Sequence, residues 1–110
     1  MPFRVEFSVQ GRDIADGIFR WIAERSPDGA SRWKAELQRT ISRIADAADT
    51  FALAAESDLY SEPVREVYFK TRKGKKYRAL FIIRGEVAYI VSVRAPGQDL
   101  VGPDELTLPE

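Results

Sequence analysis

Apolar and polar side chains alternate over the first nine residues of the chain. The apolar positions are Phe3, Val5, Phe7 and Val9. A period of two is typical of a strand that buries one of its faces. Because glycine interrupts strands, the pattern predicts that this strand ends before Gly11.

The spacing of apolar residues then changes to three and four, which predicts two amphipathic helices. The stripe of the first helix is Ile14, Ile18, Trp21 and Ile22. Ser26 and Pro27 mark the start of the second, since serine caps helices and proline is tolerated at the first helical position. The stripe of the second helix is Trp33, Leu37, Ile41, Ile44 and Ala48. The short link makes the helices antiparallel neighbours, and both tryptophans are predicted to pack in the core.

This periodicity is lost from Asp49 to Pro63, a segment that we interpret as a loop between layers. Three segments rich in β-branched and aromatic residues follow and predict strands. These segments are Val64 to Lys70, Tyr77 to Arg84 and Glu86 to Arg94. Gly74 and Gly85 lie between them and indicate two hairpin turns.

The predicted order is therefore β-α-α-β-β-β. It indicates a two-layer α+β fold in which two antiparallel helices pack on a small, mostly antiparallel sheet. The first strand has no hairpin partner, so we expect it to pair within the sheet after the two helices. We expect one domain over residues 1–98. Residues 99–110 contain two prolines, one glycine and four acids, which predicts an acidic, irregular tail.

Composition narrows the possible chemistry. The 110 residues are 45% hydrophobic and 31% charged, which is typical of a globular domain. The absence of cysteine excludes disulfides and thiolate metal sites. The absence of histidine removes the usual general base and metal ligand, and with them a Ser-His-Asp hydrolase. No apolar run resembles a signal core or a membrane span. We expect a cytoplasmic protein with no membrane partner, no cofactor and no metal site.

The formal net charge of zero hides a strong asymmetry along the chain. Residues 64–84 carry eight basic residues and one acidic residue, a net charge of +7, and the rest of the chain carries −7. Such a split indicates an anionic partner at the basic segment or, equally well, a solvated lysine-rich turn.

Several short segments, by their order and spacing over about Phe3 to Leu100, resemble the RelE/ParE superfamily, the toxins of bacterial type II toxin–antitoxin systems. The most specific are Val64-Arg65-Glu66-Val67-Tyr68-Phe69, Tyr77-Arg78-Ala79-Leu80-Phe81-Ile82-Ile83 and Val91-Ser92-Val93-Arg94. The family has the same β-α-α-β-β-β order. Its RelE-like members resemble endoribonucleases that cut mRNA on the ribosome, whereas ParE-like members inhibit DNA gyrase without catalytic residues. For both, the resemblance implies a cognate antitoxin as partner.

The resemblance also implies roles for particular residues. Arg78 matches an arginine of the family's third strand and would contact the scissile phosphate, where a guanidinium binds well. Glu56 is the candidate general base, because one ribonuclease branch has a glutamate in this loop. RNA or a protein partner would bind the remaining basic candidates. These are Lys70, Arg72, Lys73, Lys75, Lys76 and Arg94.

The chain also departs from the RelE pattern. If Val67 and Phe69 face the core, then Glu66, Tyr68 and Lys70 face outward. RelE-type nucleases carry basic residues at these outward positions, whereas here only Lys70 is basic. Arg94 is followed by Ala-Pro-Gly and an acidic segment, so the usual terminal acid is missing. An arginine stays charged and does not replace a proton donor. We favour ribosome-dependent mRNA cleavage. Two alternatives remain, a ParE-like gyrase inhibitor and a degenerate member that only binds its antitoxin.

Overall fold

The computed structural model describes residues 2–71, 74, 76–98 and 100–110. Its main elements are β1 (Arg4–Phe7), α1 (Val9–Arg25), α2 (Pro27–Ala47), β2 (Arg65–Phe69), β3 (Tyr77–Arg84) and β4 (Val87–Arg94). Two short 3-10 helices, η1 (Ala48–Thr50) and η2 (Ala55–Leu59), lie in the segment that we predicted as a loop. The α+β class is confirmed.

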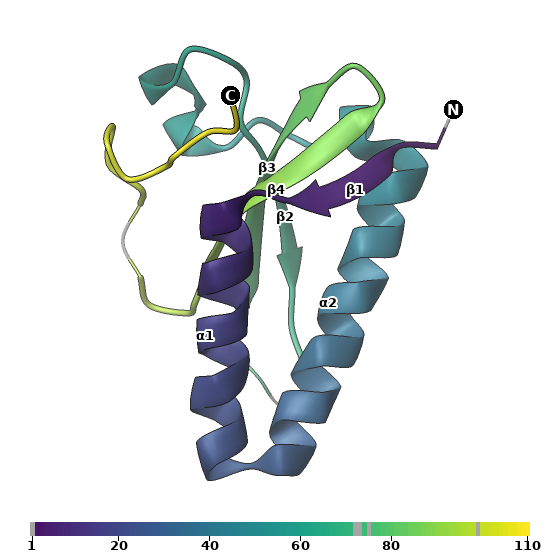
Figure 1. Ribbon diagram of the computed structural model, residues 1–110, viewed down its shortest axis with the longest axis vertical. Helices are drawn as coiled ribbons and strands as arrows, with labels where there is room; N and C mark the ends of the chain where they lie inside the picture. The colour runs from purple at the N-terminus through teal and green to yellow at the C-terminus, as the bar shows by residue number, and fades with distance from the viewer. Residues whose placement is uncertain (1, 72–73, 75, 99) are drawn as a thin grey trace.

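The four strands form one mixed sheet in the order β1-β4-β3-β2. β3 pairs antiparallel with both β2 and β4, whereas β1 pairs parallel with β4. A parallel pair needs a crossover, and the long connection from β1 to β4, which contains the antiparallel hairpin of α1 and α2 as well as β2 and β3, supplies it. In Figure 1 this hairpin lies against one face of the sheet and extends beyond it, away from both termini. The helices therefore cover one face of the sheet, and other parts of the chain cover the opposite face.

The boundary between β1 and α1 lies earlier than the alternation predicts. Ser8 is the N-cap of α1, because its Oγ accepts a hydrogen bond from the backbone N–H of Gly11 at 3.0 Å. The helix thus begins at Val9, whose side chain is 82% exposed. The prediction that Val9 continues the buried face of the strand is wrong, because the serine cap turns the chain into a helix first.

Two glycines of α1 have opposite surroundings and allow a matched test. A Cβ on Gly11 would lie 2.1 Å from the carbonyl oxygen of Ile90 in β4, whereas a Cβ on Gly17 would meet nothing within 4 Å. We expect Gly11→Ala to lower the free energy of unfolding by about 1–3 kcal/mol, because rigid backbone must move. Gly17→Ala is expected to raise it by about 0.5–1 kcal/mol through helix propensity. Urea unfolding of the two variants measures both; a stabilising Gly11→Ala would contradict the close contact with β4.

The core under the helices is centred on Trp33, which is 2% exposed. Its ring contacts those of Phe69 and Tyr77, with centroids 6.0 and 5.7 Å away. Trp21, which we predicted to be buried as well, is 58% exposed. It lies in the last turns of α1, where the hairpin extends past the sheet, and the Arg25 guanidinium covers its ring at 3.8 Å. Only one of the two tryptophans is a core residue.

The other face of the sheet is covered by irregular chain. Its buried apolar residues are Ala54, Val64, Leu80, Ile82, Val91, Val101 and Leu106. The acidic segment predicted as a tail contains no helix or strand among its described residues, but it packs on this face. Two anchors hold it. The hydroxyl of Tyr60 donates to the carbonyl of Gly102, and the side-chain amide of Gln10 donates to the carbonyl of Glu105. The C-terminal segment thus belongs to the folded domain.

Candidate functional site

The structure brings together the two residues that the sequence suggests for catalysis. Arg78 Nη1 lies 2.7 Å from Glu56 Oε1, and Arg78 Nη2 lies 2.5 Å from Glu56 Oε2. Both side chains are buried: Glu56 is 1% exposed and Arg78 is 8% exposed. They form a bidentate ion pair on the face of the sheet opposite the helices, beneath the C-terminal segment.

The strand pattern explains the position of Arg78. Ala79 and Phe81 of β3 face the helices, so Arg78 and Leu80 face the other side. Glu56 reaches the same place from η2. That short helix is fixed to the chain before β2, because the Ser57 hydroxyl accepts from the N–H of Val64 at 2.9 Å.

Two further groups complete the cluster. The backbone N–H of Val101 donates to Glu56 Oε2 at 3.0 Å, and Arg78 Nη1 also donates to Glu66 Oε1 at 3.1 Å. The cluster therefore joins η2, β2, β3 and the C-terminal segment. We refer to Glu56, Glu66, Arg78 and the Val101 N–H as the buried charge cluster.

These contacts determine the protonation of the carboxylate. Hydrogen bonds from Arg78 lower the pKa of Glu56 from 4.5 to about 2; burial opposes this shift, and the Val101 N–H contributes to it. Hydrogen bonding to Glu56 in turn raises the pKa of Arg78. At neutral pH the Glu56 carboxylate is ionised, hydrogen-bonded to Arg78 and shielded from water. It is therefore a poor acceptor for a proton from a substrate. The cluster geometry thus argues against Glu56 as general base.

The basic binding candidates are distributed over several environments. Lys70 and Lys76 are exposed, and Lys76 Nζ lies 5.5 Å from the centre of the Tyr68 ring. Arg94 lies cross-strand from Arg78, and its Nη1 is 3.4 Å from Glu105 Oε2. The remaining three candidates, Arg72, Lys73 and Lys75, lie outside the described residues.

Sequence reasoning missed two members of the buried charge cluster. Strand alternation placed Glu66 outward, but did not pair it with Arg78. The signal was present, because Glu66 and Arg78 both face away from the helices on neighbouring strands. Val101 gave no signal, since its role depends on a backbone N–H in a segment without periodicity.

A scan against protein-family models and a search of curated proteins found no match to this chain. Within the described ranges, no three acidic side chains come together as a metal site would require. None of the described helices is both long and apolar enough to cross a lipid bilayer.

Proposed function

We propose that this chain is the toxin of a type II toxin–antitoxin system, similar to the RelE/ParE superfamily. Support comes from the element order and from the sequence segments of β2, β3 and β4 that resemble the family. Arg78 adds further support for the proposal. It matches the arginine of the family's third strand, and it meets the loop residue Glu56 in one cluster. The partner that neutralises the toxin is an antitoxin.

Within this family, the buried charge cluster favours a toxin that acts by binding a protein target. Acid–base cleavage of RNA needs a base for the 2′-hydroxyl and a free cation for the phosphate. Here the candidate base, Glu56, and the candidate cation, Arg78, are hydrogen-bonded to each other, and both are shielded from water. This observation carries the proposal. DNA gyrase is the target that the ParE-like branch implies.

The experiment compares the wild type with the paired variant Glu56→Gln/Arg78→Met during induced expression in bacteria. The paired change removes both charges together, so that neither is left buried without a partner. We expect both proteins to arrest growth, with loss of DNA supercoiling and with mRNA left intact on ribosomes. Circular dichroism checks that the variant is folded. A folded variant without toxicity, beside a wild type that cleaves mRNA, would show that the cluster is catalytic.

RNA cleavage is the second candidate function, and one observation favours it. Tyr68 of β2 is 49% exposed, and Lys76 Nζ lies 5.5 Å from the centre of its ring. An aromatic ring next to cations can hold a nucleotide by stacking and by phosphate contacts. Cut mRNA on ribosomes would establish this function. A harmless wild type would instead identify a degenerate member that only binds antitoxin.

A further inference from the structure

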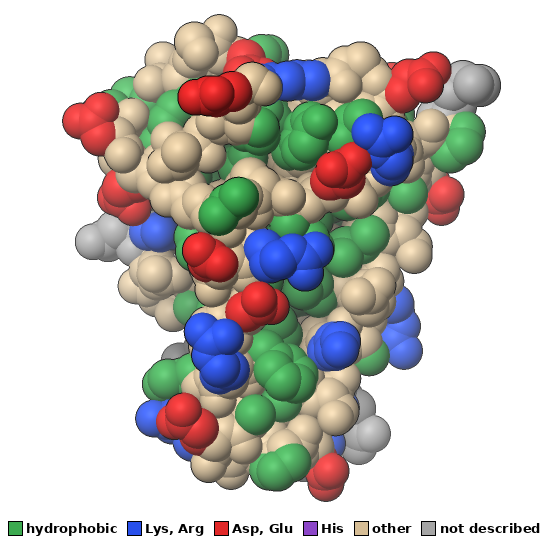
Figure 2. Space-filling view, in the orientation of Figure 1, with side chains coloured by type: hydrophobic (Ala, Val, Ile, Leu, Met, Phe, Trp, Pro, Cys, Tyr) green, Lys and Arg blue, Asp and Glu red, His purple; other side chains and the backbone are tan. Residues whose placement is uncertain are grey.

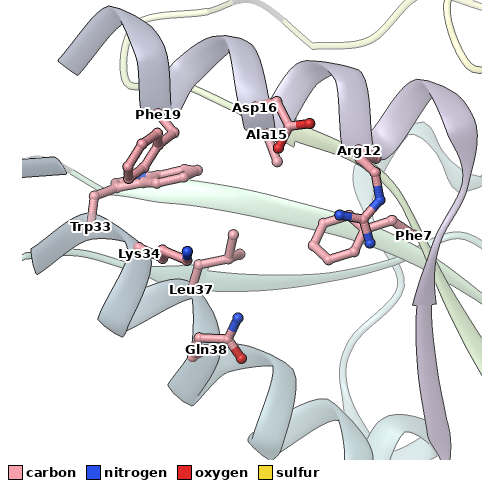
Figure 3. Close-up of a pocket in the computed structure, with 9 residues that line it drawn as sticks. All are labelled: Phe7, Arg12, Ala15, Asp16, Phe19, Trp33, Lys34, Leu37 and Gln38. Carbon is pink, nitrogen blue, oxygen red and sulfur yellow. The ribbon is translucent and has the colours of Figure 1, made fainter. Parts of the chain in front are cut away.

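One apolar face of α1 lines a groove on the surface of the molecule. The groove has a volume of ≈ 650 Å³ and is bounded on its other side by Tyr77 and by the chain that follows β4. Figure 3 shows that Ala15 and Phe19 point from α1 toward α2, so the residues of this groove lie on a different side of the helix. They recur at the spacing of a single helical stripe. We refer to them as the α1 stripe, which consists of Ile14, Gly17, Ile18 and Trp21.

The α1 stripe combines a protruding side chain with an open space. Trp21 is 58% exposed, and the guanidinium of Arg25 covers its ring. At Gly17, one helical turn away, a Cβ would meet nothing within 4 Å. Tryptophan is a frequent anchor of protein interfaces, where it fills a pocket of the partner. The stripe therefore has both a side chain that can fill a pocket and a groove that can accept one.

The charges of α1 do not favour a partner of a single sign. The helix carries three basic and three acidic residues, and Figure 2 shows side chains of both signs interspersed over the helical half of the molecule. A nucleic acid, an acidic peptide or an anionic membrane would each be attracted by an excess of basic residues. A second copy of this chain has the same balance of charges and can match it. The six charged residues are Arg12, Asp13, Asp16, Arg20, Glu24 and Arg25.

Asp13 and Arg20 arrange this balance in a twofold pattern. They are seven residues apart, which is nearly two helical turns, so they lie on the same side of α1, next to the stripe. Both are exposed, and neither forms an ion pair within the part of the chain that the structure describes. Gly17 lies near the midpoint between them, and also near the midpoint between Ile14 and Trp21. When two α1 helices cross antiparallel at this glycine, Asp13 of each copy therefore faces Arg20 of the other, and Trp21 of each faces Ile14.

We propose that this chain forms a twofold homodimer through the α1 stripe. Trp21 of each copy fills the groove of the other, and two ion pairs between Asp13 and Arg20 flank the apolar contact. Gly17 at the crossing point lets the two helices approach closely, since the distance between packed helices depends on the side chains at the contact. A contact along one 17-residue helix is small, so we expect association at micromolar to submillimolar concentration. The dimer is independent of the proposed toxin activity, and its tests do not measure toxicity.

Sedimentation velocity of the full-length protein tests the association. We expect the wild type to pass from monomer to dimer between micromolar and submillimolar concentration. Trp21→Lys is expected to raise the dimer Kd at least about tenfold, because interface tryptophans are frequent hot spots. The matched control is Leu53→Lys, the same change at an apolar residue that is 53% exposed and lies outside the groove, which should leave the Kd unchanged. A wild type that stays monomeric, or equal effects of the two lysine substitutions, would overturn the proposal.

Gly17→Gln tests the close crossing of the two helices. In the monomer the new side chain starts in open space and favours the helix, so the free energy of unfolding should not fall. Between two copies it holds the helices apart, and we expect it to raise the dimer Kd. An unchanged Kd in this variant would contradict a crossing at Gly17.

Charge reversal at low salt tests the antiparallel register. Asp13→Arg brings arginines face to face at the interface and Arg20→Asp brings aspartates face to face, so each variant alone is expected to dimerise more weakly than the wild type. An equimolar mixture of the two variants restores both pairs of opposite charge. We therefore expect a heterodimer with a Kd close to that of the wild type. A mixture that associates no better than either variant alone would overturn the twofold arrangement.

Discussion

Arg78→Met is expected to lower the free energy of unfolding by about 3–5 kcal/mol at neutral pH. The substitution leaves the Glu56 carboxylate buried with only the Val101 N–H as a remaining partner outside its own backbone. Removing one member of a buried ion pair strands an uncompensated charge, and losses of about this size follow. Against a typical total of about 5–15 kcal/mol, this is a large part of the stability of the domain. Urea unfolding at pH 7 measures the change.

A second substitution is expected to rescue the first. Adding Glu56→Gln to Arg78→Met removes the stranded charge and keeps a side-chain oxygen that can accept from the Val101 N–H. The double variant should therefore be more stable than Arg78→Met alone. Such non-additivity is typical of residues in one network. A double variant less stable than Arg78→Met would show that the cost lies in lost packing and not in the buried charge.

Arg84→Met is the matched control, because the same change is made at the other end of β3. Arg84 also forms a bidentate pair: its Nε lies 3.0 Å from Glu62 Oε1 and its Nη2 lies 2.7 Å from Glu62 Oε2. Both of these side chains are partly exposed to water. Ion pairs that remain exposed to water contribute little to stability. We expect Arg84→Met to cost far less than Arg78→Met, and equal losses would argue against burial as the cause.

The sequence predicted the elements of this fold well where a single physical signal decides them. The helical spacing of apolar residues predicted α1 and α2, and Ser26 with Pro27 starts α2 where capping chemistry predicts. The prediction for Val9 was wrong because two signals competed. Alternation extends the strand to Val9, whereas the Ser8 cap begins a helix there. Local capping prevailed over the hydrophobic pattern.

The candidate site was harder to predict, since it depends on contacts between segments far apart in the chain. Glu56 and Arg78 were each identified as chemically important, but separately, as a base and a phosphate ligand. Their pairing depends on η2 crossing the open face of the sheet, and this crossing has no periodic pattern. The contribution of Val101 depends in turn on the C-terminal segment packing on that face. Its composition of acids, prolines and glycine predicts irregular chain and says nothing of where the chain packs.

The pairing of Glu56 has a consequence for stability in acid. The pKa of this carboxyl is about 2 in the folded protein and near its ordinary 4.5 in the unfolded chain, a difference worth about 3 kcal/mol. Because the folded pKa is depressed, this stabilisation is fully present above about pH 4.5. It is lost as the pH falls through the folded value, since the carboxyl must then bind a proton and release Arg78. We therefore expect the wild type to lose most of this contribution between pH 5 and pH 2.5.

The Glu56→Gln/Arg78→Met variant removes the Glu56 carboxyl together with the ion pair between Arg78 and Glu66, and leaves the other carboxyls unchanged. Glu62, whose pKa is also lowered by hydrogen bonds from Arg84, is present in both proteins and cancels in the comparison. Urea unfolding in steps from pH 7 to pH 2.5 should show the wild type losing about 2–3 kcal/mol more than the variant. Parallel pH profiles of the two proteins would mean that Glu56 titrates normally in the folded state. Its bonds to Arg78 and to the Val101 N–H would then not stabilise the ionised carboxylate.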